Sequence, residues 1–314
     1  MSKELRKDLV FIFLMVFALA IFYRYHLLGN AVIPFDSKDQ YYPFALFVQQ
    51  SLRSGEIPLW NPYLYSGTPA FADPLYMMFY PGMLLLLIPE QLTPHIYDML
   101  EILHVLIGGI SIFVLGRQLQ FPRQAAFLSS VIFMLAGPLA GRVQHVAQIY
   151  AISLLPLSLL LLRCGLIQKH KGWFVLAGLV TGFALMIGYQ VAMLSLLILL
   201  AYTLTFFIVH KATRKEWGRR VMDVGLFCLV VIGISAIQVL PSLEFARLSS
   251  RPRFSFYQAS MSSMSPSSLF TIVFPNIYNT IVGSYWGPGD ITETYLFVGM
   301  IPLFLVVVSI LKSW

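Results

Sequence analysis

Long apolar runs recur along this chain and limit what it can fold into. Several of them reach the ~20 residues that an α-helix needs to cross the hydrocarbon core of a bilayer. Hydrophobic residues make up 58% of the chain. Only 11% of the residues are charged, against about 25% in soluble domains. These features predict an all-α polytopic membrane protein and exclude an ordinary soluble enzyme.

The apolar runs predict about eight transmembrane helices. Their approximate bounds are 9–29, 97–116, 124–140, 147–163, 172–188, 190–209, 221–241 and 295–311. A further apolar stretch, at 75–89, is only about fifteen residues long and contains Pro81. We expect an interfacial or re-entrant helix there rather than a span.

Lysine and arginine residues sort to one side of this predicted topology. Lys3, Arg6 and Lys7 precede the first span, and the strongly basic segment 211–220 joins two later spans. Because cytoplasmic loops carry an excess of Lys and Arg, the N-terminus is expected in the cytoplasm. The net charge of +7 then follows from membrane orientation, and no nucleic-acid partner is predicted.

Two long regions are expected on the outer side of the membrane, at about 30–96 and 242–294. They belong to one transmembrane module that covers residues 1–314, and the chain reads as the N-terminal part of a longer protein. The first region holds a dense polar stretch of acids, prolines and aromatic residues, whereas the predicted spans are mostly hydrophobic. We therefore expect the chemistry in the outer regions, with the helices as a scaffold.

Asp36 and Asp39 are the main catalytic candidates. They are spaced i,i+3 just after Pro34, so a helix that starts there would place both carboxylates on one face. An acidic pair at the mouth of a membrane bundle can bind a divalent cation, Mg²⁺ or Mn²⁺, through oxygen, or deprotonate a hydroxyl group. The structural alternative is that Asp36 caps the helix and Asp39 interacts with the helix dipole.

Further candidates lie in the same outer region. Asp73 precedes a proline, so it is either a ligand-binding acid or a turn former. Trp60 and Tyr63, with Asn61 between them, can stack on a sugar or lie in an interfacial aromatic belt. The sequence leaves both interpretations open for each residue.

Basic side chains on the outer side suggest an anionic ligand. Arg142 can bind a phosphate, and His145 can orient a leaving group or bind a metal. Arg251 and Arg253, in the second outer region, run against the charge bias and suggest a lipid phosphate. Each arginine also has a simpler role, which is contact with lipid headgroups.

Other chemistries lack their motifs. The chain has no P-loop, no Rossmann glycine pattern, no H-E-x-x-H and no G-x-S-x-G. A divalent cation held by Asp36 and Asp39 is therefore the one cofactor that the sequence suggests.

Several motifs resemble the bacterial YfhO family of membrane proteins. They are FDSKDQYYPF at 35–44, GEIPLWNPY at 55–63, SGTP at 66–69 and Ala-Asp-Pro at 72–74, with weaker pieces at 141–145, 240–244, 249–251, 274–278 and 295–299. That family is similar to the GT-C glycosyltransferases, which use polyprenyl-phosphate-linked sugars outside the cytoplasmic membrane. The resemblance implies a GT-C-like arrangement of helices, with interfacial helices in a large first outer loop.

The resemblance also implies an activity. It is an inverting transfer of a sugar from a polyprenyl-phosphate carrier to an outer glycan, such as teichoic acid, or to a protein, at a bacterial cytoplasmic membrane. Asp36 would act on the acceptor hydroxyl and Asp39 would assist it or hold a metal ion. Arg142 and an arginine from 251–253 would stabilise the departing lipid phosphate.

Two other classes of function stay open. One is a non-catalytic flippase or transporter for lipid-linked glycans, which charge buried within the spans would favour. The other is a scaffold subunit of a cell-envelope assembly complex.

Overall fold

Helices account for the architecture of the chain. The computed structural model describes residues 3–210, 213–249, 253, 255–261, 263–280 and 283–313. Within these residues no strand forms, and the nearest approach to one is an isolated bridge between Asn61 and Thr68. The prediction of an all-α protein is confirmed.

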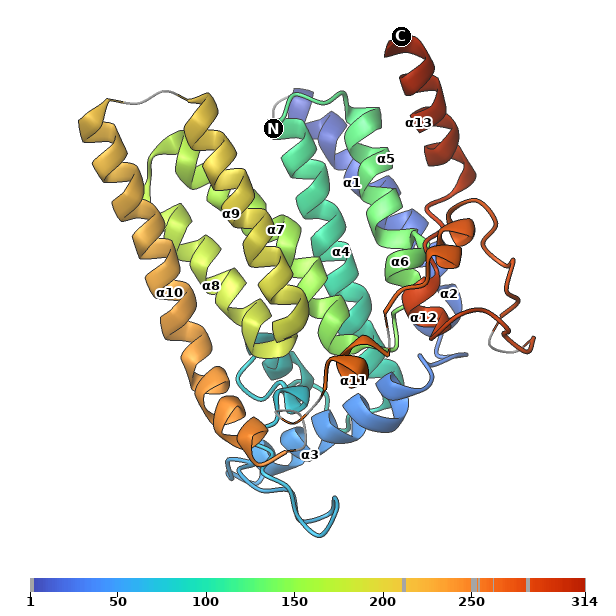
Figure 1. The fold of residues 1–314 in the computed structure, drawn as a ribbon. Coiled ribbons are helices and arrows are strands. Elements are labelled where there is room, and N and C mark those ends of the chain that lie inside the picture. Colours follow the sequence, from blue (N-terminus) through green and yellow to red (C-terminus); the bar gives the residue numbers. More distant parts are fainter. Residues whose placement is uncertain are drawn as a thin grey trace.

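The long helices stand approximately side by side, with α13 apart from the others and α3 lying across the lower end of the bundle (Figure 1). The long helices are α1 (Lys3–Phe22), α4 (Pro94–Gln118), α5 (Arg123–Leu135), α7 (Val146–Gln168), α8 (Lys171–Ile187), α9 (Tyr189–Val209), α10 (Arg214–Arg247) and α13 (Met300–Ser313). The shorter elements are α2 (Arg24–Leu27), the π-helix η1 (Ser37–Tyr41), α3 (Tyr42–Arg53), η2 (Pro74–Tyr76), η3 (Pro81–Leu87), α6 (Gly137–Ala140), α11 (Phe256–Ser260), η5 (Pro266–Ile272) and α12 (Ile291–Thr294). Both ends of the chain lie at the top of the view in Figure 1.

Five helices are long and apolar enough to cross a membrane by length and composition. They are Pro94–Gln118, Arg123–Ala140, Val146–Gln168, Tyr189–Val209 and Arg214–Arg247. Two more apolar helices, α8 and α13, are shorter. The described residues therefore support a membrane protein with five candidate spans, whereas the sequence predicts about eight.

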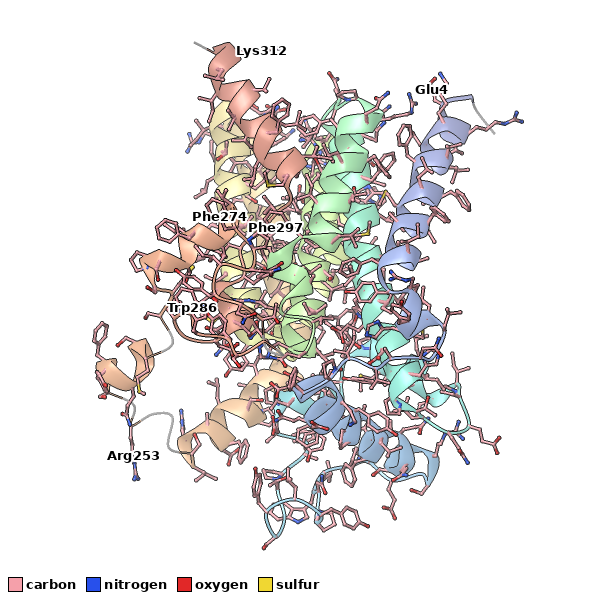
Figure 2. The ribbon with its side chains drawn as sticks, turned by 90° about the vertical axis from the view of Figure 1, so that its right-hand side faces the viewer. Glu4, Arg253, Phe274, Trp286, Phe297 and Lys312 are labelled. Atoms are coloured by element: carbon pink, nitrogen blue, oxygen red, sulfur yellow. The ribbon has the colours of Figure 1, made fainter. Side chains whose placement is uncertain are left out.

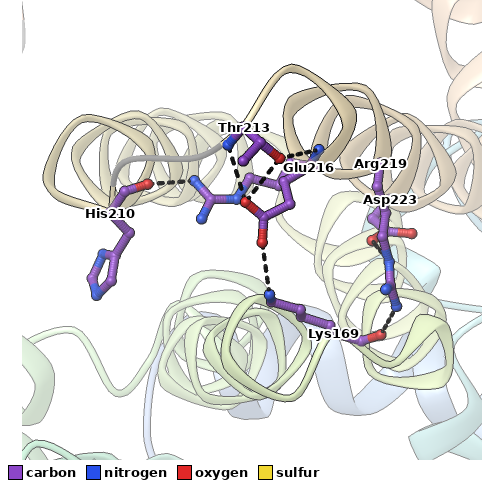
Figure 3. Close-up of polar contacts among 7 residues, drawn as sticks. Lys169, His210, Thr213, Glu216, Arg219 and Asp223 are labelled. Carbon is purple, nitrogen blue, oxygen red and sulfur yellow. Dashed lines mark hydrogen bonds and ion pairs between the residues drawn. The ribbon is translucent and has the colours of Figure 1, made fainter.

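Ion pairs and charge-assisted hydrogen bonds join the helices at the upper end of the bundle. Lys169 Nζ lies 3.2 Å from Glu216 Oε1, and Arg219 donates a hydrogen bond to the backbone carbonyl of Lys169 (Figure 3). On the other side of the bundle, Arg123 Nε donates to Asp8 Oδ1 over 2.6 Å. The basic connections and the termini therefore share one end, as the charge pattern of the sequence predicts.

Several predicted boundaries differ from the structure; among them, the last span, predicted at 295–311, begins only at Met300. The first helix ends at Phe22, well before the predicted end of the span at 29. The single helix expected at 75–89 is replaced by the short 3-10 helices η2 and η3, because Met77 takes a left-handed conformation and Pro81 lacks a backbone N–H. The helix α10 continues through Pro241, so the second outer region begins after its predicted start at 242.

A glycine allows α7 to pass close to the connection between α8 and α9. A Cβ atom on Gly188 would lie 2.6 Å from the carbonyl oxygen of Ala147 and 3.0 Å from the Cβ of Ala151. The first of these atoms belongs to the backbone of a buried helix, so it has little room to move. Small residues at such crossings are what permits close helix packing in a membrane.

We expect Gly188→Ala to lower the free energy of unfolding by about 1–3 kcal/mol, because the added methyl group overpacks this crossing. Thermal unfolding of the purified protein in detergent measures the effect. The matched control is Gly225→Ala in α10, where an added Cβ meets nothing within 4 Å and the helix gains intrinsic stability. A Gly188→Ala protein as stable as the wild type would contradict this account of the crossing.

Candidate functional site

The two predicted catalytic acids, at the start of the π-helix η1, differ in their exposure and in their contacts. Phe35 has a left-handed φ of 57°, and its carbonyl accepts a 2.7 Å hydrogen bond from the Asp39 N–H, an α-type turn that leads into η1. Asp36 is half-exposed at this start, whereas Asp39 is exposed. The carboxylate of Asp39 has no partner among the residues that the structure describes, so only Asp36 contacts another predicted site residue. π-helical turns of this kind are frequent at functional sites.

His145 connects Asp36 to the second outer region. Its Nδ1 lies 3.4 Å from Asp36 Oδ2, and its Nε2 lies 3.1 Å from Thr292 Oγ1. The Thr292 hydroxyl donates to Asp290 Oδ1 over 2.8 Å, so it accepts from His145 Nε2. The imidazole of His145 therefore lies between the Asp36 carboxylate and the Thr292 hydroxyl, which is itself bound to Asp290.

Arg142 adds contacts at the place where Asp36, His145 and Thr292 meet, which we call the junction. Its Nε donates to the Thr292 carbonyl and its Nη1 donates to Gln148 Oε1, each over 3.3 Å. Three segments that are far apart in sequence thus meet here: η1, the start of α7, and α12 with its cap Asp290. Of the residues predicted for the site, the structure brings together Asp36, Arg142 and His145.

A small cavity lies beside this junction. Its volume is about 170 Å³, and its polar lining includes Tyr41, Gln148, Tyr189 and Gln190. The hydroxyl of Tyr41 accepts a hydrogen bond from the Ala147 backbone N–H. Burial, and to a lesser extent the Asp36 carboxylate, raise the pKa of Tyr41 far above its usual value, so this hydroxyl stays protonated. A cavity of this size and polarity can hold one small polar group beside Asp36.

The remaining candidates of the first outer region support the loop. Asp73 Oδ1 accepts from the Leu75 N–H and caps η2. Asn61 is buried, and its side chain donates to Tyr76 Oη over 2.8 Å and accepts from the Tyr63 N–H. These contacts match the structural interpretation of Asp73 and give Asn61 a structural contact as well.

Both aromatic candidates are exposed, Trp60 by 56% and Tyr63 by 86%. The ring of Trp60 packs against Gly67, where a Cβ would lie 2.4 Å from it. On its other side the loop is tied to α10, because Gln238 Nε2 and Ser242 Oγ donate to the carbonyls of residues 71 and 72. The wall of the cavity at Pro74 and Leu75 follows directly after this attachment.

The arginines of the second outer region do not join the site within the described residues. Arg251 lies outside the described residues. Arg253 is exposed and lies at the edge of the molecule in Figure 2. Of the predicted phosphate ligands, Arg142 alone is therefore placed at the junction.

Donors for a metal ion are sparse at this junction. Among the described residues, no group of three or more His, Cys, Asp or Glu side chains is arranged to hold a metal ion. Asp36 and His145 are two possible ligands in contact with each other, and Asp39 is exposed.

The sequence analysis missed a buried polar face on α4. Asp98, Glu101 and His104 recur every third residue, and each side chain is at most 2% exposed. Asp98 Oδ2 accepts from the Ile33 N–H, which fixes the chain just before η1. Acids at this spacing inside an apolar run are a signal of function that is visible in the sequence.

No family model, curated protein or solved structure matches this chain.

We expect Asp36 and His145 to be energetically coupled. In a double-mutant cycle with Asp36→Asn and His145→Asn, the coupling energy should be about 0.2–1 kcal/mol, because the carboxylate is half-exposed and solvent screens the pair. Thermal unfolding in detergent at low salt measures it. The matched cycle of Asp39→Asn with His145→Asn should be additive, and equal coupling in both cycles would rule out a specific contact.

Proposed function

We propose that this chain is a membrane glycosyltransferase that moves a sugar from a polyprenyl-phosphate-linked donor to a glycan or protein acceptor outside the cytoplasmic membrane of a bacterium. The observation that carries the proposal is the junction of Asp36, His145 and Thr292, which unites the two outer regions around one half-exposed carboxylate. The motif resemblance to the YfhO family and its GT-C-like relatives supports the same class.

The proposed topology extends the five candidate spans to eight. α1, α8 and α13 would also cross the bilayer, which puts the basic end of the bundle in the cytoplasm and the junction outside. This orientation agrees with the basic segment at 211–220 and with the acids of the outer regions. The polar cavity beside Tyr41 would then open toward the outer surface.

In the proposed reaction, Asp36 takes the proton from the acceptor hydroxyl as that oxygen forms a bond to the anomeric carbon. The bond from this carbon to the phosphate oxygen breaks, and the electron pair leaves with the lipid phosphate. A single displacement of this kind inverts the anomeric configuration. The second carboxylate oxygen of Asp36 is available for this step, because only Oδ2 faces His145.

His145 and Arg142 have positioning and electrostatic roles in this proposal. His145 would hold the Asp36 carboxylate in one orientation through the contact at Oδ2. Arg142 would stabilise the negative charge that grows on the departing phosphate. Because its guanidinium already donates to Thr292 and Gln148, it is held at the junction before a donor binds.

A transporter for lipid-linked glycans is the second candidate. The observation that favours it is the buried acid Glu101 within α4, since ionisable side chains inside a span commonly mark an ion or substrate pathway. Measurement of transfer and of transport with the same purified protein separates the two classes.

We expect Asp36→Asn to lower the rate of sugar transfer by about 10²- to 10⁴-fold, the range for loss of a general base. The assay uses purified protein, radiolabelled polyprenyl-phosphate sugars and a cell-envelope acceptor fraction, with thermal unfolding as a check of folding. The matched control, Asp39→Asn, removes an exposed acid from the same turn and should change the rate far less.

The outcomes of this assay are distinct. Equal transfer by the wild type and Asp36→Asn would move the base to another residue. Transfer by neither protein, together with lipid-linked sugar crossing reconstituted vesicles, would replace the transferase by the transporter. A chelator added to the wild type tests whether a divalent cation takes part.

A further inference from the structure

Glu101 is a fully buried acid that has no hydrogen-bonding partner within the described part of the chain. Its side chain is 0% exposed, and neither carboxylate oxygen has a hydrogen bond or ion pair among the residues that the structure describes. It lies in α4, which is one of the candidate spans. Burying an ionised carboxylate in an apolar interior without compensation is very unfavourable, so Glu101 either carries a proton or has a bound cation beside it.

Other oxygen atoms in the same region also lack partners. The hydroxyl groups of Tyr97 and Tyr150 are completely buried, and neither has a hydrogen-bonding partner in the described part of the chain. Both tyrosines interact electrostatically with Glu101 and pack in one cluster between α4 and α7. Tyr97 lies one turn before Glu101 on α4, and Tyr150 stacks on the ring of His104, which lies about one turn after Glu101. Within the described residues, this region of the bundle therefore holds one carboxylate and two hydroxyl groups without hydrogen-bonding partners.

The neighbouring side chains do not supply the missing charge. His104 Nδ1 donates to the Leu100 carbonyl over 2.7 Å, and the Tyr80 hydroxyl, 2.5 Å from Nε2, donates to that nitrogen, so a neutral imidazole satisfies both contacts. Its ring stacks on Tyr150, with the centroids 3.7 Å apart. The other titratable groups that interact electrostatically with this region are acidic or phenolic. They are Asp98 on α4, Tyr23 after α1, Tyr41 on η1 and Tyr80 before η3. Two more acids, Asp36 and Asp73, interact with Tyr41.

The ligand set favours a single charge. Divalent cations are generally held by several carboxylates, whereas Asp98 is engaged by the Ile33 N–H, and no group of three acids, histidines or cysteines forms in the described residues. One carboxylate carries a single negative charge, which one monovalent cation neutralises.

We propose that Glu101, with the hydroxyl groups of Tyr97 and Tyr150, binds one monovalent cation, a proton or a sodium ion, inside the helical bundle. Tyr41 interacts electrostatically with the carboxylates of both Glu101 and Asp36, so it links the proposed site to the junction. This inference is independent of the proposed sugar transfer, because it concerns α4 and α7 and not the outer regions.

Infrared spectroscopy and sodium binding distinguish the two ions. Purified wild type and Glu101→Gln are compared at neutral pH, first in sodium-free buffer with choline chloride and then with added NaCl at constant ionic strength. A carboxylic-acid carbonyl band that is present in the wild type and lost in the variant assigns a proton to Glu101. Binding of ²²Na⁺ that is lost in the variant, with loss of the acid band as sodium is added, assigns a sodium ion.

Two further variants keep the test sharp. Glu90→Gln removes an exposed acid from the loop before α4 and should change neither signal. Tyr150→Phe removes one proposed oxygen ligand, so it should weaken sodium binding by about tenfold or shift the acid band. If the wild type shows neither a Glu101-dependent acid band nor Glu101-dependent sodium binding, the proposal is wrong.

Discussion

Close packing between helices is the constraint on which this structure depends. Lipid tails are as apolar as leucine, so helices in a bilayer gain little from burying leucine and associate through van der Waals contact at small residues. A Cβ atom on Gly109 of α4 would lie 2.3 Å from the sulfur of Met134 in α5. One on Gly178 of α8 would lie 2.9 Å from the carbonyl of Phe227 in α10. These contacts hold α4, α5, α8 and α10 in fixed relation, and Gly188 does the same for α7.

This packing determines where the candidate site can form. The first residues of α7 follow directly on His145, so a rigid α7 fixes the imidazole that joins Asp36 to Thr292. The outer regions themselves have few regular elements, and their positions depend on side-chain contacts with the helix ends. A change deep in the bundle is therefore expected to reach the junction through α7.

The sequence predicted the parts of this protein that depend on local pattern. Apolar runs of helical length located α4, α7 and α9, and the polar stretch of acids and aromatic residues located the region of short elements that precedes α4. Residue types alone identified Asp36 and His145, but their contact depends on the way α7 and η1 pack. The contact of His145 with Thr292 joins residues 147 positions apart, so no local pattern could reveal it. The π-helical turn that separates Asp36 from Asp39 was also invisible, because the same spacing fits an α-helix.

The carboxylates of Asp36 and Glu101 have opposite environments. This contrast corresponds to the two candidate functions, a transferase and a transporter. Asp36 faces solvent and a basic partner, which suits a group that exchanges a proton with a substrate. Glu101 is sealed between helices among phenol groups, which suits a group that holds its cation for longer. The sequence analysis placed all chemistry in the outer regions, and it overlooked α4 because the apolar residues around Glu101 dominate the hydropathy of that run.

The attachment of the first outer region to α10 has a mechanical consequence. Pro241 cannot donate a hydrogen bond inside α10, so the helix is weakest in the turn that also carries Gln238 and Ser242. Those two side chains bind the carbonyls of residues 71 and 72, just before the cavity wall. A bend of α10 at this proline would move the attached segment that forms one wall of the cavity. The cavity would then widen or narrow without any movement of α4 or α7.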